Sequence, residues 1–391
     1  MAPCPACSSV GMEIFHEAPS VPTNSCILMT TPEEARAYPR GDIRLAVCRT
    51  CGFISNVAFE PEQTEYSGRY EETQGFSGTF RAFHEALAGE LIEKYDLRGK
   101  DILEIGCGKG EFISLLADLG DNRGVGFDPG YLKDRNPGKG RDRVVFRKEF
   151  YSEDHGYLGA DLICCKMTLE HIHRPQPLLS AVRQSASRRK DTVVFFQVPD
   201  VTRILEDCAF EDIYYEHCSY YGAGSLARLF RRFGFGVLSL EGVYGGQYLT
   251  IEAALSGEPL EEEDGRDAED LAEHLALVSG FQDRCRAKLA EWEQRLGEFG
   301  RSGKHVVLWG SGSKAVSFLT TLENAGIVNH VVDINPFRQG HFMPGTGQAI
   351  LAPDDLVHHR PDVVIVLNPI YAEEISSDLD ARGLSPEIVT L

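Results

Sequence analysis

Four cysteines near the amino end are spaced as metal ligands. They form two Cys-x-x-Cys pairs, Cys4 with Cys7 and Cys48 with Cys51. Zinc prefers four thiolates in a tetrahedron, and a two-residue gap lets one tight turn direct both sulfurs of a pair at the same point. Four thiolates leave no open coordination position, so we expect structural zinc rather than catalytic zinc. The long interval between the pairs exceeds ordinary zinc-ribbon spacing and predicts an inserted segment.

Disulfides and free thiols are the alternatives for these cysteines. The first residues, Met1-Ala-Pro-Cys4, have neither the basic start nor the apolar run of a signal peptide. We therefore expect a cytoplasmic, reducing compartment, in which disulfides are the weaker explanation.

A glycine-rich turn downstream has the composition of a nucleotide-cofactor loop. Glu104, Gly106, Gly108 and Gly110 follow one another at the end of a predicted strand, and Asp128 ends the next strand. Glycine permits the sharp turn and the close backbone approach that such a cofactor needs, and the later acid suits ribose hydroxyls. The glycines alone leave dinucleotides and S-adenosylmethionine (SAM) open, but the Glu104 carboxylate suits a cationic methionyl group and favours SAM.

This pattern, Glu-x-Gly-x-Gly-x-Gly with a later Asp, resembles the class I SAM methyltransferases. The resemblance implies that the segment after the fourth strand, which contains Glu170 and His171, lines the methyl-transfer pocket. It also puts Phe150, just past the third strand, near the adenine. The alternatives are a plain core role for Phe150 and a helix-capping role for His171.

A cluster of phenols, carboxylates and an imidazole follows the fifth predicted strand, in the run Tyr214-Tyr215-Glu216-His217. Loops at the carboxyl ends of parallel strands are where open α/β sheets bind ligands. A histidine can take a proton from carbon because its pKa lies near neutral pH, and the neighbouring groups can orient it. A buried, hydrogen-bonded histidine in an aromatic loop is the equally weighted alternative.

The elements that must position these residues alternate between strands and helices. Five apolar, β-branched segments are separated by helical stretches and are followed by a helix and two more strands, which predicts an α/β fold with a seven-stranded sheet. The predicted strands are 102–105, 125–127, 144–146, 162–165, 193–198, 237–240 and 248–253. An apolar stripe over residues 80–95 predicts a helix that packs on this sheet.

An acidic stretch at residues 261–265 precedes a predicted long helix over residues 267–299. Its apolar residues follow a seven-residue repeat, which fits a coiled-coil dimer seam or, more commonly, packing within the chain. We therefore favour a monomer, although the sequence does not fix the oligomeric state.

From Lys304 a second series of strands and helices predicts a Rossmann-like domain. Gly310 and Gly312, with Lys314 and the later Asp333, fit a short dinucleotide fingerprint. Three hypotheses remain for this domain: binding of a substrate nucleotide, a structural lid, and a true NAD site.

Longer motifs resemble the sugar 3-C-methyltransferases that act on nucleotide-linked 4-keto deoxysugars. The resemblance covers nearly the whole chain in the same order of three modules and includes the four zinc cysteines. It is carried by Val198-Pro199-Asp200, Ile213-Tyr-Tyr-Glu-His-Cys-Ser-Tyr220, Gly245-Gly-Gln247 and Val332 to Thr346.

The resemblance implies a role for each matching residue. His217 would be the general base at carbon 3, with Glu216 and Tyr214 orienting it, Tyr70 completing the site and His171 assisting. The substrate-binding residues would be Tyr66, Gln247, Lys314 and Asn368. Tyr215 and Leu367 depart from the family pattern on the acceptor side, so a small non-sugar molecule with an acidic C–H bond is the alternative acceptor.

We therefore predict four regions: a zinc-binding domain at 1–78, a SAM-dependent methyltransferase domain at 79–256, an acidic linker and long helix at 257–303, and a substrate-binding domain at 304–391. The chain has 391 residues, enough for two or three domains with cores of their own. No apolar run is long enough to span a membrane. A net charge of −20 argues against nucleic acid as a partner, and so against a zinc-ribbon RNA methyltransferase. We expect a small-molecule substrate.

Overall fold

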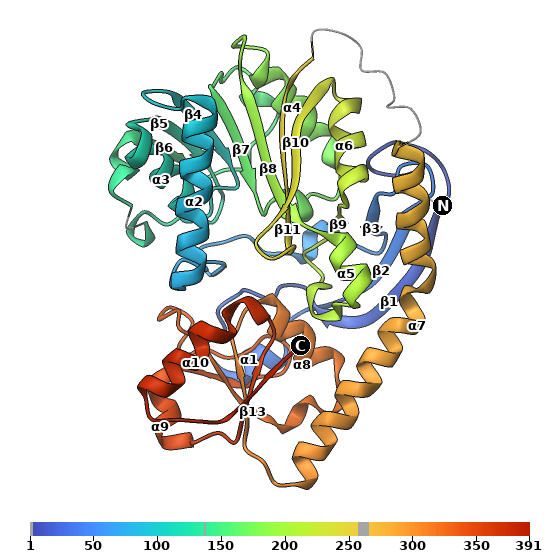
Figure 1. Ribbon diagram of the computed structural model, residues 1–391, viewed down its shortest axis with the longest axis vertical. Helices are drawn as coiled ribbons and strands as arrows, with labels where there is room; N and C mark the ends of the chain where they lie inside the picture. Colours follow the sequence, from blue (N-terminus) through green and yellow to red (C-terminus); the bar gives the residue numbers. More distant parts are fainter. Residues whose placement is uncertain (1–2, 137, 257–265) are drawn as a thin grey trace.

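Three β-sheets organise the computed structural model, which describes residues 3–136, 138–256 and 266–391. The acidic stretch at 261–265 and the first residues of the predicted linker lie outside the described residues. Figure 1 shows the largest sheet in the upper half of the molecule and the carboxyl-terminal sheet below it, with the amino-terminal strands along one side.

The amino-terminal sheet has the strand order β1-β2-β3-β9. Its strands are β1 (Met12–Pro22), β2 (Arg40–Cys48), β3 (Ile54–Asn56) and β9 (Ser219–Tyr220). The last strand comes from the middle of the chain, where Ile54 pairs with Tyr220 and Ser55 with Ser219. The short helix α1 (Pro32–Arg36) begins at Thr31, whose side chain accepts a hydrogen bond from the Glu34 amide. This sheet therefore ties the segment after His217 to the amino-terminal module.

The seven-stranded sheet has the order β10-β11-β8-β7-β4-β5-β6, which confirms the predicted α/β fold. Its strands are β4 (Asp101–Ile105), β5 (Arg123–Phe127), β6 (Val144–Arg147), β7 (Leu162–Lys166), β8 (Val193–Pro199), β10 (Phe235–Val243) and β11 (Tyr248–Leu255). Strands β4 to β8 are parallel, whereas β11 is antiparallel to β8 and to β10. Parallel strands buried on both faces are continuous apolar runs, as β7 and β8 are.

The helices that pack against this sheet are α2 (Gly78–Tyr95), α3 (Glu111–Gly120), α4 (Pro175–Ala186) and α6 (Ala223–Arg232). Helix α5 (Val201–Asp207) follows β8, but its buried residues join a hydrophobic cluster with the amino-terminal and carboxyl-terminal sheets. The side chain of Ser77 accepts from the Phe80 amide and starts α2, and the side chain of Asp200 accepts from the Thr202 amide and starts α5. Both caps fix where a helix leaves the carboxyl edge of the sheet.

The carboxyl-terminal sheet is parallel, with the order β14-β13-β12-β15-β16. Its elements are β12 (Val306–Trp309), α8 (Ser313–Thr321), β13 (Val328–Val332), β14 (Ala349–Leu351), α9 (Leu356–His359), β15 (Val363–Val366), α10 (Ala372–Ala381) and β16 (Glu387–Thr390). Sequence patterns did not predict β14 and β16, because each is short and lies at a sheet edge without a long apolar run.

The long helix α7 (Arg266–Arg301) packs its apolar stripe inside the chain. Val278, Cys285, Trp292 and Leu296 join one buried cluster that also contains residues of the amino-terminal and carboxyl-terminal sheets. We expected each domain to bury its own core, but this core is shared because α7 runs alongside both parts (Figure 1). Long as α7 is, no helix among the described ranges is apolar enough over a sufficient length to cross a membrane.

The shared core predicts the effect of shortening a buried side chain on α7. Phe281, fully buried where the seven-residue repeat breaks, packs edge-on against Phe15 with ring centroids 5.8 Å apart. Phe281→Ala should lower the free energy of unfolding by about 3–5 kcal/mol because it leaves a cavity. The exposed Gln294→Ala should change it by less than about 0.5 kcal/mol. Urea denaturation checks both; equal effects of the two changes would contradict this account of the core.

Candidate active site

A cavity of about 750 Å³ lies at the carboxyl ends of β4, β5 and β7. Its lining includes most of the residues predicted to bind SAM, and two predicted for the reaction, Tyr70 and His171. Those predicted for SAM are Glu104, Gly106, Gly108, Asp128 and Phe150. Gly110 and Glu170 are not among the lining residues. A pocket at this edge is where open α/β sheets place ligands.

The glycine loop adopts backbone conformations that residues other than glycine rarely adopt. Gly106, Gly108 and Gly110 have φ values of +69°, +54° and +81°. A Cβ on Gly106 would stand 2.0 Å from Thr168 Oγ1, so only glycine fits without movement. The Asp128 carboxylate accepts hydrogen bonds from the Gly108 amide at 2.9 Å and the Gly130 amide at 2.7 Å, which holds the loop in place.

Glu104 is buried beside the loop, and its carboxylate accepts from the Ile113 amide at 3.0 Å. Burial raises the pKa of Glu104 to about 7, an effect that the nearby Lys166 opposes. Lys166 is itself buried, and burial lowers its pKa to about 8. Its ammonium lies 3.7 Å from the centre of the Phe112 ring and 2.8 Å from His84 Nε2. Sequence patterns did not predict Lys166 or His84, because neither belongs to a motif.

A second lysine, Lys109, connects the amino-terminal segment to the cofactor loop. The Lys109 ammonium donates to the carbonyl oxygens of Tyr70 and Gly130 and to the Glu72 carboxylate, at 2.8, 3.3 and 3.2 Å. All four residues line the cavity. The segment after the cysteine region thus forms one wall of the predicted SAM pocket.

Two imidazoles meet at the end of this cavity. His171 lines it, and the His217 ring lies against His171 with centroids 4.9 Å apart. His171 Nδ1 is 3.0 Å from the Tyr66 hydroxyl, and His217 Nε2 is 2.9 Å from the Tyr214 hydroxyl. His217 is only 4% exposed and does not itself line the cavity, so His171 is the imidazole that faces the pocket.

Burial keeps both imidazoles neutral. It lowers the pKa of His171 to about 4 and that of His217 well below the usual value, where His171 and Lys314 add to the effect. A neutral imidazole has a free lone pair, which is the form that accepts a proton.

Two buried carboxyls accompany the imidazoles. Glu170 has an oxygen 4.0 Å from His217 Nε2, and both its carboxyl oxygens are buried without a hydrogen-bond partner among the described residues. Burial raises the pKa of Glu170 to about 8. Glu216 accepts from the amide of Ser25 at 2.9 Å and from its hydroxyl, and burial raises the pKa of Glu216 to about 7. Glu170, predicted beside the cofactor, is therefore placed beside His217.

Ser25 was not predicted, yet it joins three parts of the chain. Its hydroxyl also bonds to the Ser313 hydroxyl at 2.6 Å, at the start of α8 in the carboxyl-terminal domain. Cys26, the next residue, lies 3.2 Å from the guanidinium of the buried Arg338. Only the three-dimensional arrangement reveals these contacts, because the partners are about 290 and 310 positions apart.

The predicted substrate-binding residues fall into separate groups. Tyr66 lines the cavity. Gln247 and Asn368 exchange two amide hydrogen bonds, at 2.8 and 2.9 Å, between the methyltransferase and carboxyl-terminal parts. The Lys314 ammonium pairs with the Asp212 carboxylate.

In the carboxyl-terminal domain, the Asp333 carboxylate accepts hydrogen bonds from the glycine turn. Asp333 accepts from the amide and the hydroxyl of Ser311 at 2.8 and 2.5 Å and from the Asn335 amide. The Asp333 carboxylate thus holds its glycine turn through backbone amides, as Asp128 holds the glycine loop of the methyltransferase part.

The four predicted zinc ligands lie together. Their sulfur atoms are all within 4.8 Å of one another, with Cys4 Sγ 3.8 Å from Cys51 Sγ and Cys7 Sγ 3.6 Å from Cys48 Sγ. A tetrahedron with Zn–S bonds of about 2.3 Å has edges of about 3.8 Å, so this donor set fits zinc. Disulfide sulfurs stand much closer, at about 2.05 Å.

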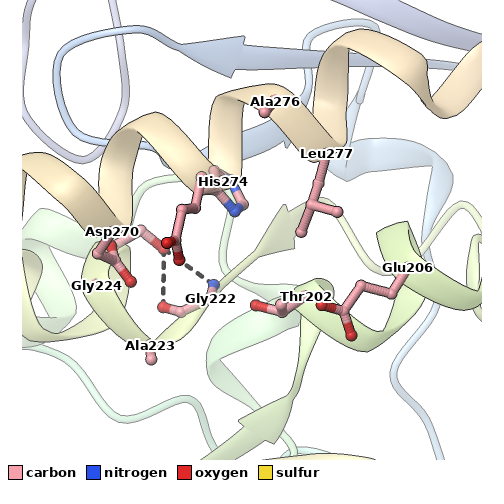
Figure 2. Close-up of a pocket in the computed structure, with 11 residues that line it drawn as sticks. Thr202, Glu206, Gly222, Ala223, Gly224, Asp270, His274, Ala276 and Leu277 are labelled. Carbon is pink, nitrogen blue, oxygen red and sulfur yellow. Dashed lines mark hydrogen bonds between the residues drawn. The ribbon is translucent and has the colours of Figure 1, made fainter.

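A second cavity, of about 310 Å³, lies between α5, α6 and α7 (Figure 2). Thr202, Gly222, Asp270 and His274 are among its lining residues, and it contains no predicted site residue. It is thus separate from the pocket with the glycine loop and the imidazoles.

The buried Glu170 predicts a pH-dependent stability. Between about pH 5 and pH 8 the unfolded chain loses this proton while the folded chain keeps it, so the wild type loses up to about 1.4 kcal/mol of stability per pH unit. Glu170→Gln has no proton to lose. Its free energy of unfolding relative to the wild type should therefore rise with pH, which urea denaturation at pH 5.5 and 7.5 measures. A difference independent of pH would contradict the buried, protonated carboxyl.

Two domain models and a curated relative match this chain. Residues 78–240 match a methyltransferase domain model, and residues 258–383 match a C-methyltransferase C-terminal domain model. The chain is 27% identical over 358 residues to C-methyltransferase NovU of Streptomyces niveus, covering 85% of this chain and 81% of the relative.

Two solved structures resemble part of the chain. A magnesium protoporphyrin IX methyltransferase from Synechocystis, with SAH bound, is 14% identical over 46% of this chain and 84% of its own, with a TM-score of 0.36. A SAM-dependent methyltransferase from Clostridium acetobutylicum is 12% identical over 44% of this chain and 91% of its own, with a TM-score of 0.35. Taken with the two domain models and the C-methyltransferase relative, the fold and its pocket lead to one conclusion: the chain is a SAM-dependent C-methyltransferase.

Proposed function

We propose that this enzyme methylates a carbon next to a ketone, with His217 as the general base, and that the acceptor is carbon 3 of a nucleotide-linked 4-keto deoxysugar. The observation that carries the proposal is the neutral imidazole pair at the end of the cofactor cavity, with phenols and carboxyls around it. When bound, SAM supplies an electrophilic methyl group. The protein must therefore generate a nucleophilic carbon beside it.

His217 takes the proton through Nε2, next to the Tyr214 hydroxyl. The proton leaves the substrate carbon for Nε2, and the electron pair of the broken C–H bond stays in the enolate, whose negative charge balances the imidazolium. The Glu170 carboxyl keeps its own proton, and one of its oxygens lies 4.0 Å from Nε2, next to the positive charge. Glu216 does not touch the imidazole through its carboxylate, which Ser25 holds, so its role is to fix the backbone that carries His217. His171 and Tyr66 line the cavity next to His217, and the ketone binds against them, with its acidic C–H bond towards His217 and the cofactor on its other side.

The SAM-binding role rests on the cavity around the glycine loop. Glu104, Asp128 and the loop glycines line it, and Phe150, 63% exposed, lies where the adenine would be covered on one side. Gly110 acts through the loop, since a Cβ there would stand 2.4 Å from the Phe146 ring. Tyr70 closes the cavity from the amino-terminal segment.

The carboxyl-terminal domain supplies the nucleotide part of the acceptor site in this proposal. The amino end of α8 presents backbone amides beside Gly312, and the Lys314 ammonium, which is paired with Asp212, lies in the first turn. Helix amino ends and lysines both suit phosphate oxygens. Gln247 and Asn368 bridge the two parts that would enclose the sugar.

The general base is tested by substitution and solvent exchange. His217→Asn should lower turnover by about 10²- to 10⁴-fold because the proton acceptor is lost, while SAM affinity stays nearly unchanged. In deuterated buffer without SAM, the wild type should incorporate deuterium next to the ketone and His217→Asn should not. Because His171 faces the cavity, His171→Asn is the matched comparison. Loss of exchange in His171→Asn with exchange retained in His217→Asn would assign the base to His171.

The acceptor is identified by mass spectrometry of keto-sugar nucleotides incubated with enzyme and SAM. We expect a gain of one carbon-bound methyl on a 4-keto deoxysugar nucleotide. Methylation of small non-sugar ketones alone would overturn the sugar assignment while leaving C-methylation intact.

We also propose that the four amino-terminal cysteines bind structural zinc, on the basis of their sulfur separations. Cys48→Ser should remove one zinc ion per chain and lower thermal stability, because three ligands no longer close the tetrahedron. Cys208→Ser, a buried thiol outside the cluster, should keep the zinc content. Unchanged zinc in Cys48→Ser would rule out this site.

A further inference from the structure

Three histidines from separate segments meet near the amino end of β12 in the carboxyl-terminal sheet. His305 directly precedes β12, His330 lies on β13, and His359 ends α9. One ring nitrogen of each lies within 4.8 Å of the corresponding nitrogens of the other two. Ser313, which contacts Ser25, and Lys314, the proposed nucleotide contact, follow the opposite end of β12, so this cluster is separate from the proposed reaction centre.

The hydrogen bonds leave coordinating nitrogens free. His305 Nδ1 lies 2.8 Å from the His359 carbonyl oxygen, which fixes the tautomer with its proton on Nδ1 and leaves Nε2 with a lone pair. This is the backbone contact that orients metal-ligating histidines. His330 Nδ1 is buried and has no hydrogen-bond partner among the described residues. A buried ring nitrogen without a partner is costly unless something binds there.

The environment of His330 and the ring geometry both suit a bound cation. Burial lowers the pKa of His330, and His359 and His305 lower it further, which favours the neutral ring that coordinates a metal. His330 and His359 have ring centroids 4.4 Å apart at an angle of 54°, and His305 lies 6.1 Å from each. The rings are therefore not stacked face to face as a plain aromatic cluster.

We propose that His305, His330 and His359 bind one first-row transition-metal ion of the zinc class, with water in the fourth position. Imidazole nitrogens suit Zn²⁺, Ni²⁺ and Cu²⁺. Nitrogens that share a tetrahedral zinc at about 2.0–2.1 Å stand about 3.4 Å apart, so small rotations of these half-buried rings close the site. The ion links the chain before β12, the strand β13 and the end of α9, and so stabilises the carboxyl-terminal domain.

Metal content tests the proposal on the full-length protein. Wild type, His330→Gln, His359→Gln and His358→Gln are dialysed against micromolar zinc and then against metal-free buffer, and zinc per chain is measured by inductively coupled plasma mass spectrometry. His358 is the matched control, because it neighbours His359 on α9 but is exposed and outside the cluster. Zinc held by the amino-terminal cysteines is common to all four proteins and cancels in the comparison.

We expect the wild type and His358→Gln to hold one zinc ion per chain more than His330→Gln and His359→Gln. Added zinc should also raise the melting temperature of the first two proteins and not of the last two, because an ion that binds only the folded state stabilises it. His359→Gln, on a surface helix, gives an independent test in case His330→Gln, on a strand, fails to fold. Equal zinc content in all four proteins would overturn the proposal.

Discussion

Burial of the Glu216 carboxyl beneath Ser25 is the constraint on which the arrangement of the three parts depends. A buried carboxyl needs hydrogen-bond donors, and here the donors are the amide and hydroxyl of a residue about 190 positions away. The same hydroxyl reaches Ser313 in the carboxyl-terminal domain. One serine therefore couples the segment that carries His217 to the other two parts, and α7 packs along the same junction. The site exists only when all three parts are in place.

The elements of the methyltransferase fold could be predicted from sequence because their signals are local. Strands such as β7 and β8 are continuous apolar runs, and Gly106 needs a positive φ that marks its turn. The SAM loop could be predicted for the same reason, because the spacing of its glycines along the sequence determines the shape of the turn. The short edge strands β14 and β16 lack such a signal, since a strand of three or four residues is defined by its partner rather than by its own pattern.

The contacts that assemble the site could not be predicted to the same depth, because they join distant segments. Nothing near Lys109 in sequence indicates that its ammonium binds Glu72 and the Tyr70 carbonyl, and nothing near Gln247 indicates its pairing with Asn368. The position of Glu170 beside His217 and outside the lining of the cavity has the same origin. The segment before β9 contacts Glu170 there, since the Cys218 amide donates to the Glu170 carbonyl oxygen at 3.0 Å.

Burial away from solvent also determines which side chains of the site are protonated. Glu170, with its raised pKa, and His217, with its lowered pKa, favour a neutral acid beside a neutral base, since an isolated charge would lack solvation. In the proposed reaction, moving a proton from a weakly acidic carbon to the neutral imidazole creates an imidazolium next to an enolate. The two opposite charges attract each other strongly in surroundings with little water, and this lowers the barrier to proton transfer. Water in the pocket would weaken that attraction, and in the proposed reaction Tyr66 and Tyr70, which line the cavity from the amino-terminal segment, help to exclude it.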